Sequence, residues 1–168
     1  MPPIPSSADL FARMNRIKSA IDALHRPDRP VVGIGHSIGA TILLLLSGVE
    51  GWTKGGMEHL SVQREIEFEK LLLLAPALDF FPDPRALEPV VARVWFWLGR
   101  KDEMVPVAKV EAMQANARPG QEVGVFIDEL AGHFTCMDEL PPQVKDTHPN
   151  RQSYLLGLAD QVCRVITW

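Results

Sequence analysis

Apolar positions recur at helical spacing in two segments, one near each end of the chain. The first segment runs from about Ser7 to Leu24 and can be capped by Ser6 or Ser7, which predicts an amphipathic helix. Its expected buried face consists of Leu10, Met14, Ile17, Ile21 and Leu24. The second segment covers 150–166, and the buried face expected there consists of Tyr154, Leu155, Leu158, Val162 and Ile166.

Four shorter runs are almost continuously apolar, at 31–35, 70–75, 94–98 and 123–127. Periodicity does not decide the leucine-rich run at 70–75, but its shortness and the proline that follows favour a buried parallel strand. Helices are expected at 37–47 and 106–115. Strands that alternate with helices indicate a three-layer α/β/α architecture with a mostly parallel sheet of about four strands.

The connecting segments are less regular. Residues 48–57 contain four glycines and predict a loop. The polar stretch 58–69 can begin as a helix, whereas 76–89 contains four prolines and is expected to be irregular.

Composition narrows the class of protein. The chain has 168 residues, of which 46% are hydrophobic, and this predicts one domain over residues 1–168. The net charge is −4 and the basic residues are scattered, which argues against nucleic acid or an anionic membrane as the partner. No signal peptide and no membrane span are expected from the sequence, so a cytoplasmic location is predicted.

Cysteine and histidine spacing gives no sign of a metal or cofactor. Cys136 and Cys163 form no C-x-x-C pair, and reduced thiols are expected. The histidines and carboxylates show no spacing typical of a metal site. We therefore expect neither a metal nor a cofactor.

The segment from Gly35 to Gly39 reads Gly-His-Ser-Ile-Gly and lies between a predicted strand and a predicted helix. A sharp strand-to-helix turn of this kind requires small residues near the serine, and we expect both glycines to relieve Cβ clashes. The turn places Ser37 at a helix N-terminus, where backbone N–H groups can face a developing negative charge. Ser37 is therefore a candidate nucleophile.

A serine hydroxyl needs a base to remove its proton and a group that orients the base. Asp102 and His133 each follow directly after a predicted strand, at 94–98 and at 123–127. The chain thus has the order serine, acid, histidine that accompanies a serine in such a strand-to-helix turn, and Ser37, His133 and Asp102 are expected to act as nucleophile, base and orienting acid.

Other residues compete for these roles. Asp79 follows the leucine-rich strand and Asp128 follows the next strand but one, so either can be the acid. His36 is expected to be a packing residue of the turn rather than a base. The other histidines are His25, His59 and His148, and none has a matching strand before it.

Three motifs, at 35–40, 99–106 and 131–134, resemble the serine α/β-hydrolases, and within them the dienelactone-hydrolase-like esterases. The resemblance covers the chain from Asp9 onward. It implies hydrolysis of an ester, thioester or related acyl compound through an acyl-enzyme, with the N–H of Ile38 in the oxyanion hole. Dienelactone hydrolases use cysteine where this chain has Ser37, so a lactone substrate is not expected.

The chain also departs from that family before residue 31. The family has several strands there, and a loop after one of them supplies the second oxyanion donor. Only a helix is expected here, which predicts a short or N-terminally truncated version of the fold and leaves the strand at 31–35 as an apolar edge. The chain can be part of a longer protein, can pair this edge with another copy, or can cover it with residues 1–30.

The substrate and the activity are less well determined. Phe80, Phe81, Phe134 and Met137 follow strand ends and are candidates to line a pocket for an apolar acyl group, with ordinary core packing as the alternative. The segment 78–89 is too short for a large helical cap, so a fairly open site for small or medium esters is expected. A catalytically weak or inactive remnant that acts as a binding module is the alternative to a hydrolase. An acyltransferase would use the same residues.

Overall fold

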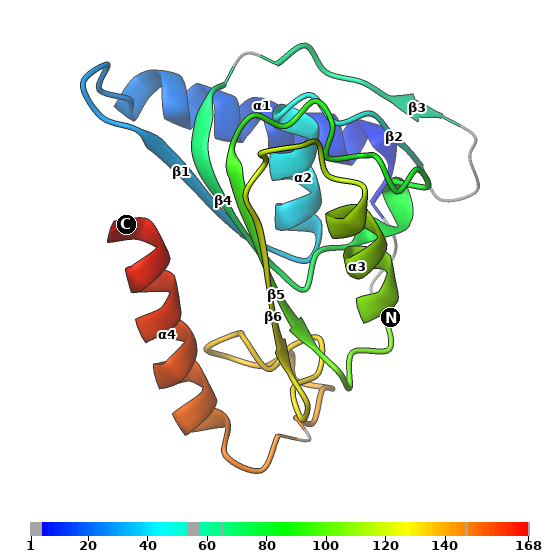
Figure 1. Ribbon diagram of the computed structural model, residues 1–168, viewed down its shortest axis with the longest axis vertical. Helices are drawn as coiled ribbons and strands as arrows, with labels where there is room; N and C mark the ends of the chain where they lie inside the picture. Colours follow the sequence, from blue (N-terminus) through cyan, green and yellow to red (C-terminus); the bar gives the residue numbers. More distant parts are fainter. Residues whose placement is uncertain (1–4, 54–57, 65, 147, 168) are drawn as a thin grey trace.

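The computed structural model describes residues 5–53, 58–64, 66–146 and 148–167. In this part of the chain the main sheet has four strands in the order β1-β4-β5-β6 (Figure 1). The strands are β1 (Val31–His36), β4 (Phe68–Leu74), β5 (Arg93–Gly99) and β6 (Val123–Asp128). Every neighbouring pair is parallel, as predicted.

Helices cover both faces of this sheet. They are α1 (Ser7–Leu24), α2 (Ile38–Leu46), α3 (Val107–Ala115) and α4 (Arg151–Thr167). The first three share one apolar cluster with the sheet, and α4 packs on the opposite face (Figure 1). The predicted three-layer α/β/α architecture is therefore confirmed. Among the described residues no helix is long and apolar enough to cross a membrane.

Strand β4 explains the leucine-rich run at 70–75. Leu71 and Leu73 point into the cluster under α1, α2 and α3, whereas Leu72 points toward α4. All three side chains are fully buried. A central parallel strand is covered on both faces, so it reads as a continuous apolar run.

The two terminal helices have nearly the predicted faces. Ser6 caps α1 in a capping box with Asp9, and the helix buries Leu10 and Met14. Leu24, expected on this face, is 80% exposed because it lies in the last position of the helix. In α4 the buried residue is Leu158. Ile166, also expected on the buried face, is exposed, because Val165 packs against the sheet in its place.

The segment between α2 and β4 differs from its prediction. No helix begins at 58–69 in the described residues; β2 (Gly51–Trp52) pairs instead with the antiparallel strand β3 (His59–Leu60). The rings of Trp52 and His59 lie 4.7 Å apart, and Leu60 is buried in the main cluster. Cross-strand contacts of this kind stabilise extended backbone despite polar neighbours. Residues 54–57 of the predicted loop lie outside the description.

Strand β1 lies at one edge of the sheet. It pairs with β4 on one side, and in the described part of the chain no strand pairs with the other side. Ile34, in the middle of β1, is 50% exposed. The predicted apolar edge is therefore present.

Candidate active site

Ser37 occupies a sharp turn between β1 and α2. Its backbone has φ 52 and ψ −120. Residues other than glycine rarely adopt this conformation, and it is found mainly at functional sites. The Ser37 N–H donates to the Leu74 carbonyl at 2.9 Å, and the Ser37 carbonyl accepts from the N–H of Thr41 at 3.1 Å. Bonds to β4 and to α2 thus hold the strained residue on both sides.

The two glycines that flank this turn are not equivalent. A Cβ at Gly35 would lie 2.7 Å from the backbone nitrogen of Ala40, closer than real Cβ atoms approach. A Cβ at Gly39 would meet no atom within 4 Å. The close contact therefore requires a glycine at position 35. The expectation of a clash at Gly39 is wrong, because that position faces open space.

Asp102 lies beyond the carboxyl end of β5 and is 7% exposed. Its Oδ1 accepts hydrogen bonds from the N–H groups of Met104 at 2.8 Å and Val105 at 3.0 Å. Its Oδ2 lies 2.8 Å from Nδ1 of His133. The backbone donors fix the carboxylate so that one oxygen faces the imidazole.

His133 joins the other two residues. Its Nε2 lies 2.9 Å from Oγ of Ser37, and the residue is 7% exposed. A carboxylate accepts hydrogen bonds, so Nδ1 of His133 donates to Asp102 and the neutral ring presents Nε2 as an acceptor for the Ser37 hydroxyl. The structure therefore brings together the three side chains that the sequence singled out. Such an arrangement can remove a proton from a serine hydroxyl.

The loops that carry Asp102 and His133 are packed against each other. The N–H of Lys101 donates to the Ala131 carbonyl at 2.9 Å. A Cβ at Gly99 would overlap that same carbonyl. Glycine is therefore needed at the end of β5 to let the two loops approach.

The competing acids lie elsewhere. Asp79 has a side chain that is 66% exposed and pairs with Lys109 at 3.5 Å. Asp128 accepts from the N–H groups of Leu130 and Ala131, each at 2.8 Å, and so supports the loop before His133. Within the described residues, neither carboxylate is hydrogen-bonded to His133, in contrast to Asp102.

His36 contacts the site in a way that sequence reasoning missed. Its Nε2 lies 2.8 Å from the backbone oxygen of His133, and the two rings lie 5.0 Å apart. The pKa of His36 is lowered, and burial is the largest of several causes. Its position beside Ser37 was the sequence signal; the partner is a backbone atom, which no motif records.

The predicted oxyanion donor and pocket residues have different surroundings. Ile38 is the first residue of α2, where backbone N–H groups have no partner within the helix. Phe80 and Phe81 are 4% and 1% exposed within the main cluster, which favours the core alternative over a pocket lining. Phe134 is partly exposed and meets the His133 ring edge-on at 4.8 Å. Met137 is half-buried in the turn that follows.

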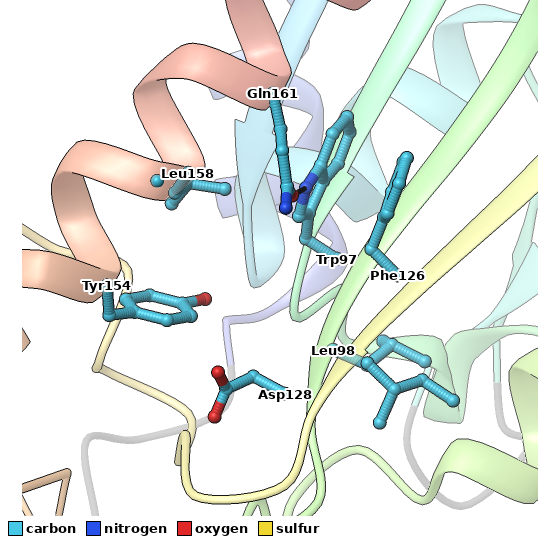
Figure 2. A pocket seen from close by; sticks show the side chains of 9 residues that line it. Trp97, Leu98, Phe126, Asp128, Tyr154, Leu158 and Gln161 are labelled. Atoms are coloured by element: carbon cyan, nitrogen blue, oxygen red, sulfur yellow. Dashed lines mark hydrogen bonds between the residues drawn. The ribbon is translucent and has the colours of Figure 1, made fainter.

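A cavity of about 230 Å³ lies on the other side of the sheet, between α4 and the strands β5 and β6 (Figure 2). Tyr154 and Leu158 face Trp97 and Phe126 across it. The Trp97 indole N–H donates to the side-chain oxygen of Gln161 at 2.8 Å. The competing acid Asp128 lines this cavity, whereas Ser37, Asp102 and His133 do not.

The two cysteines lie in different surroundings, one partly buried and one exposed. Cys136 and Cys163 are both free thiols, as predicted. Burial raises the pKa of Cys136 to about 11, so this thiol is protonated at neutral pH. In the described residues, histidine, cysteine, aspartate and glutamate form no group that could hold a metal ion.

Comparisons with known proteins support the fold. Neither a protein-family model nor a curated protein matches the sequence. A protein of Xanthomonas campestris pv. campestris described as an α/β-superfamily hydrolase is 20% identical, with a TM-score of 0.55; the match covers 93% of this chain and 70% of that one. Esterase 2 of Thermogutta terrifontis is 17% identical, with a TM-score of 0.54, and the match covers 95% of this chain and 63% of that one.

A third solved structure has a name close to the predicted resemblance. A protein of Klebsiella pneumoniae subsp. pneumoniae described as a dienelactone hydrolase is 14% identical, with a TM-score of 0.55; the match covers 89% of this chain and 60% of that one. The chain has the α/β-hydrolase fold and spans less than two thirds of the length of the Thermogutta and Klebsiella proteins.

Proposed function

We propose that the protein is a serine hydrolase that cleaves an ester, thioester or related acyl substrate through an acyl-enzyme. The observation that carries the proposal is the hydrogen-bonded series from Ser37 Oγ to His133 Nε2 and from His133 Nδ1 to Asp102 Oδ2. The strained turn at Ser37 supports it, because such strain is found mainly at functional sites.

The proposed reaction begins at the Ser37 hydroxyl. As Oγ attacks the substrate carbonyl carbon, its proton passes to Nε2 of His133, and the carbonyl π electrons move onto the oxygen. The positive imidazolium is stabilised by Asp102, whose charge is held in place by the N–H groups of Met104 and Val105. The backbone N–H of Ile38 is the proposed donor to the oxyanion.

The tetrahedral intermediate formed by this attack then collapses to an acyl-enzyme, which water hydrolyses. The bond to the leaving alkoxide or thiolate breaks, and His133 returns its proton to that group, which leaves an ester between the acyl group and Ser37. Water attacks this ester with His133 as the base, and the acid product departs as Oγ recovers its proton. An acceptor alcohol in place of water would give acyl transfer by the same residues.

The proposed substrates are small or medium acyl compounds, because the segment 78–89, between β4 and β5, is too short to form a large helical cap over the site. Phe134 and Met137 lie near His133 in the chain and are proposed to contact the acyl group. One oxyanion donor, the N–H of Ile38, is proposed from this chain. Loss of one donor costs about a hundred- to a thousand-fold in rate, so slow turnover is expected.

The proposal is tested with a reagent for activated serines. Thermogutta terrifontis esterase 2, which has a similar fold, is phosphorylated by paraoxon. We expect Ser37 to gain one phosphoryl group from paraoxon, with release of p-nitrophenolate, or one phosphonyl group from a fluorophosphonate probe, with release of fluoride. Intact-protein mass spectrometry and peptide mapping measure the product. The variant Ser37→Ala should stay unmodified. A folded wild-type protein that remains unmodified over hours would contradict the proposal.

The second candidate is a hydrolase-fold binding module with weak or no catalysis. The open edge of β1 favours it, because a strand with a free side can pair with an extended segment of another chain. The two candidates give different results in the same experiment. Modification at Ser37 requires an activated hydroxyl, whereas a binding module does not.

A further inference from the structure

Two adjacent residues, the last residue of β1 and the first residue after it, reach the same partner. Ser37 Oγ lies 2.9 Å from the ring Nε2 of His133, and His36 Nε2 lies 2.8 Å from the backbone oxygen of His133. The turn is therefore bonded both to the side chain and to the main chain of His133.

Ring packing reinforces the second bond. The rings of His36 and His133 are tilted by 48° with their centroids 5.0 Å apart. The Phe134 ring lies edge-on to both, at 6.2 Å from His36 and 4.8 Å from His133. The three rings form a cluster over the serine turn that limits how far the His133 backbone can shift.

The other hydrogen bonds of the His133 loop lead away from the serine. Ala131 is bonded to Lys101 and to Asp128, and the Gly132 N–H donates to Oγ1 of Thr135 at 2.8 Å. In the described part of the chain, the bonds from His36 and Ser37 are the ones that join the turn to this loop. The Ser37 bond is lost once Oγ attacks a substrate, whereas the His36 bond takes no part in the reaction.

The proton on His36 follows from its partner. A carbonyl oxygen only accepts, so Nε2 of His36 carries the hydrogen and donates. Because burial lowers the pKa of His36, the ring is neutral near pH 7. A neutral donor holds the loop without adding a second positive charge beside the imidazolium that forms on His133.

We propose that His36 is a positioning residue that ties the His133 main chain to the serine turn and so keeps Nε2 of His133 aligned with Ser37 throughout the reaction. The role rests on the proposed hydrolase function. It assigns no proton transfer to His36, which differs in this from His133.

Two substitutions separate the hydrogen bond from packing. His36→Phe keeps a ring but has no donor, whereas the side-chain amide of His36→Gln can reach the same carbonyl. We expect the fluorophosphonate labelling rate and kcat for p-nitrophenyl acetate to fall about 10- to 100-fold in the Phe variant, with KM nearly unchanged. The Gln variant should recover most of the loss. Wild-type rates in the Phe variant, or equal losses in both variants, would overturn the proposal.

A measurement independent of turnover separates this proposal from the hydrolase function. The Nδ1–H of His133, bonded to Asp102, should give a slowly exchanging downfield proton signal in NMR spectra of the wild type and the Gln variant. It should broaden or disappear in the Phe variant. An unchanged signal in the Phe variant would refute positioning even if no variant were catalytic. The exposed His25→Gln is the matched control and should keep wild-type values.

Discussion

The Asp102 side chain is held beside His133 by backbone N–H groups of the residues that follow it. Its Oδ1 is engaged by the N–H groups of Met104 and Val105, so Oδ2 is left to face the imidazole. Asp79 has an exposed carboxylate that pairs with Lys109. At the scale of single residues, burial and fixed donors thus distinguish two aspartates that both follow strands of the sheet.

Exchange of these carboxylates for amides tests the assignment. Asp102→Asn removes the charge that stabilises the His133 imidazolium and permits the wrong tautomer, so kcat should fall roughly a thousand- to ten-thousand-fold. Asp79→Asn is the matched control and should change kcat less than about twofold, the effect expected of an exposed ion pair. Initial rates on p-nitrophenyl acetate provide the comparison. A larger loss in the Asp79 variant would reassign the acid.

The two thiols should differ strongly in reactivity. Burial raises the pKa of Cys136 to about 11, so at pH 8 only about one in a thousand of these groups is thiolate. Cys163 is exposed. Iodoacetamide at pH 8, followed by peptide mass spectrometry, should therefore modify Cys163 much faster than Cys136, with Cys136 gaining on it as pH approaches 11. Equal rates at pH 8 would contradict this.

At the scale of elements, the β1–α2 turn depends on one close contact. The absence of a Cβ at Gly35 lets the end of β1 approach the first turn of α2, where Ala40 lies.

Lys70 fastens α4 to the opposite face of the sheet. Its Nζ donates to the carbonyls of Val165 and Ile166 at 2.9 and 3.0 Å, at the C-terminal end of α4.

The two glycines of the turn provide a matched pair of substitutions. Gly35→Ala places a methyl group 2.7 Å from backbone atoms, so we expect a loss of about 1–3 kcal/mol in unfolding free energy, in the range for overpacked positions. Gly39→Ala meets open space and lies within a helix, where alanine is favoured by up to about 1 kcal/mol. Urea denaturation measures both. Comparable stability of the two variants would refute the steric argument.

Lys70→Met tests how α4 is held on the sheet. The lysine is 3% exposed, and its removal leaves two helix-end carbonyls without their charged donor. We expect a loss of about 1.5–3 kcal/mol, the range for hydrogen bonds to charged groups. Hydrogen exchange should quicken in the last turn of α4 before the rest of the chain. Lys145→Met, at an exposed position, is the control and should leave both measurements unchanged.

Sequence patterns predicted the elements whose signal is local. The run at 70–75 and the Gly-x-Ser-x-Gly motif identified β4 and the turn at Ser37, because burial on both faces and a tight reversal each leave a mark in neighbouring residues. The β2–β3 pair escaped prediction, since its strands have two residues each and depend on contacts across the pair. The His36 bond also escaped, because its acceptor is a backbone oxygen 97 positions away.

At the scale of the whole molecule, the layers are unequal. Three helices cover one face of the sheet, whereas α4 packs on the other face, in a cluster with residues of β1, β4 and β5 (Figure 1). In the part of the chain that the structure describes, no strand pairs with the outer side of β1, and Ile34 at the centre of this strand is 50% exposed. The Thermogutta and Klebsiella proteins with this fold are longer than this chain.

The free side of β1 should make the protein self-associate. Natural sheets protect their edges with charges, prolines or bulges. Residues 31–36 carry no lysine, arginine or acid, and the register shift between Val31 and Val32 lies at the start of the strand. We expect sedimentation velocity to show dimers or larger species that increase with concentration, through pairing of two β1 strands. Ile34→Lys should shift the protein toward monomer with little change in stability, because the replaced side chain is half-exposed.

A charge elsewhere should not have this effect. Val91, 49% exposed in the segment before β5, offers a control of equal exposure away from the edge. Val91→Lys should leave the distribution of species unchanged, because it alters net charge without touching β1. If both variants dissociate the assembly equally, general charge repulsion is the cause. A wild-type protein that stays monomeric at high concentration would show that the edge does not mediate association. The slow turnover expected of the proposed site would then be a property of the monomer.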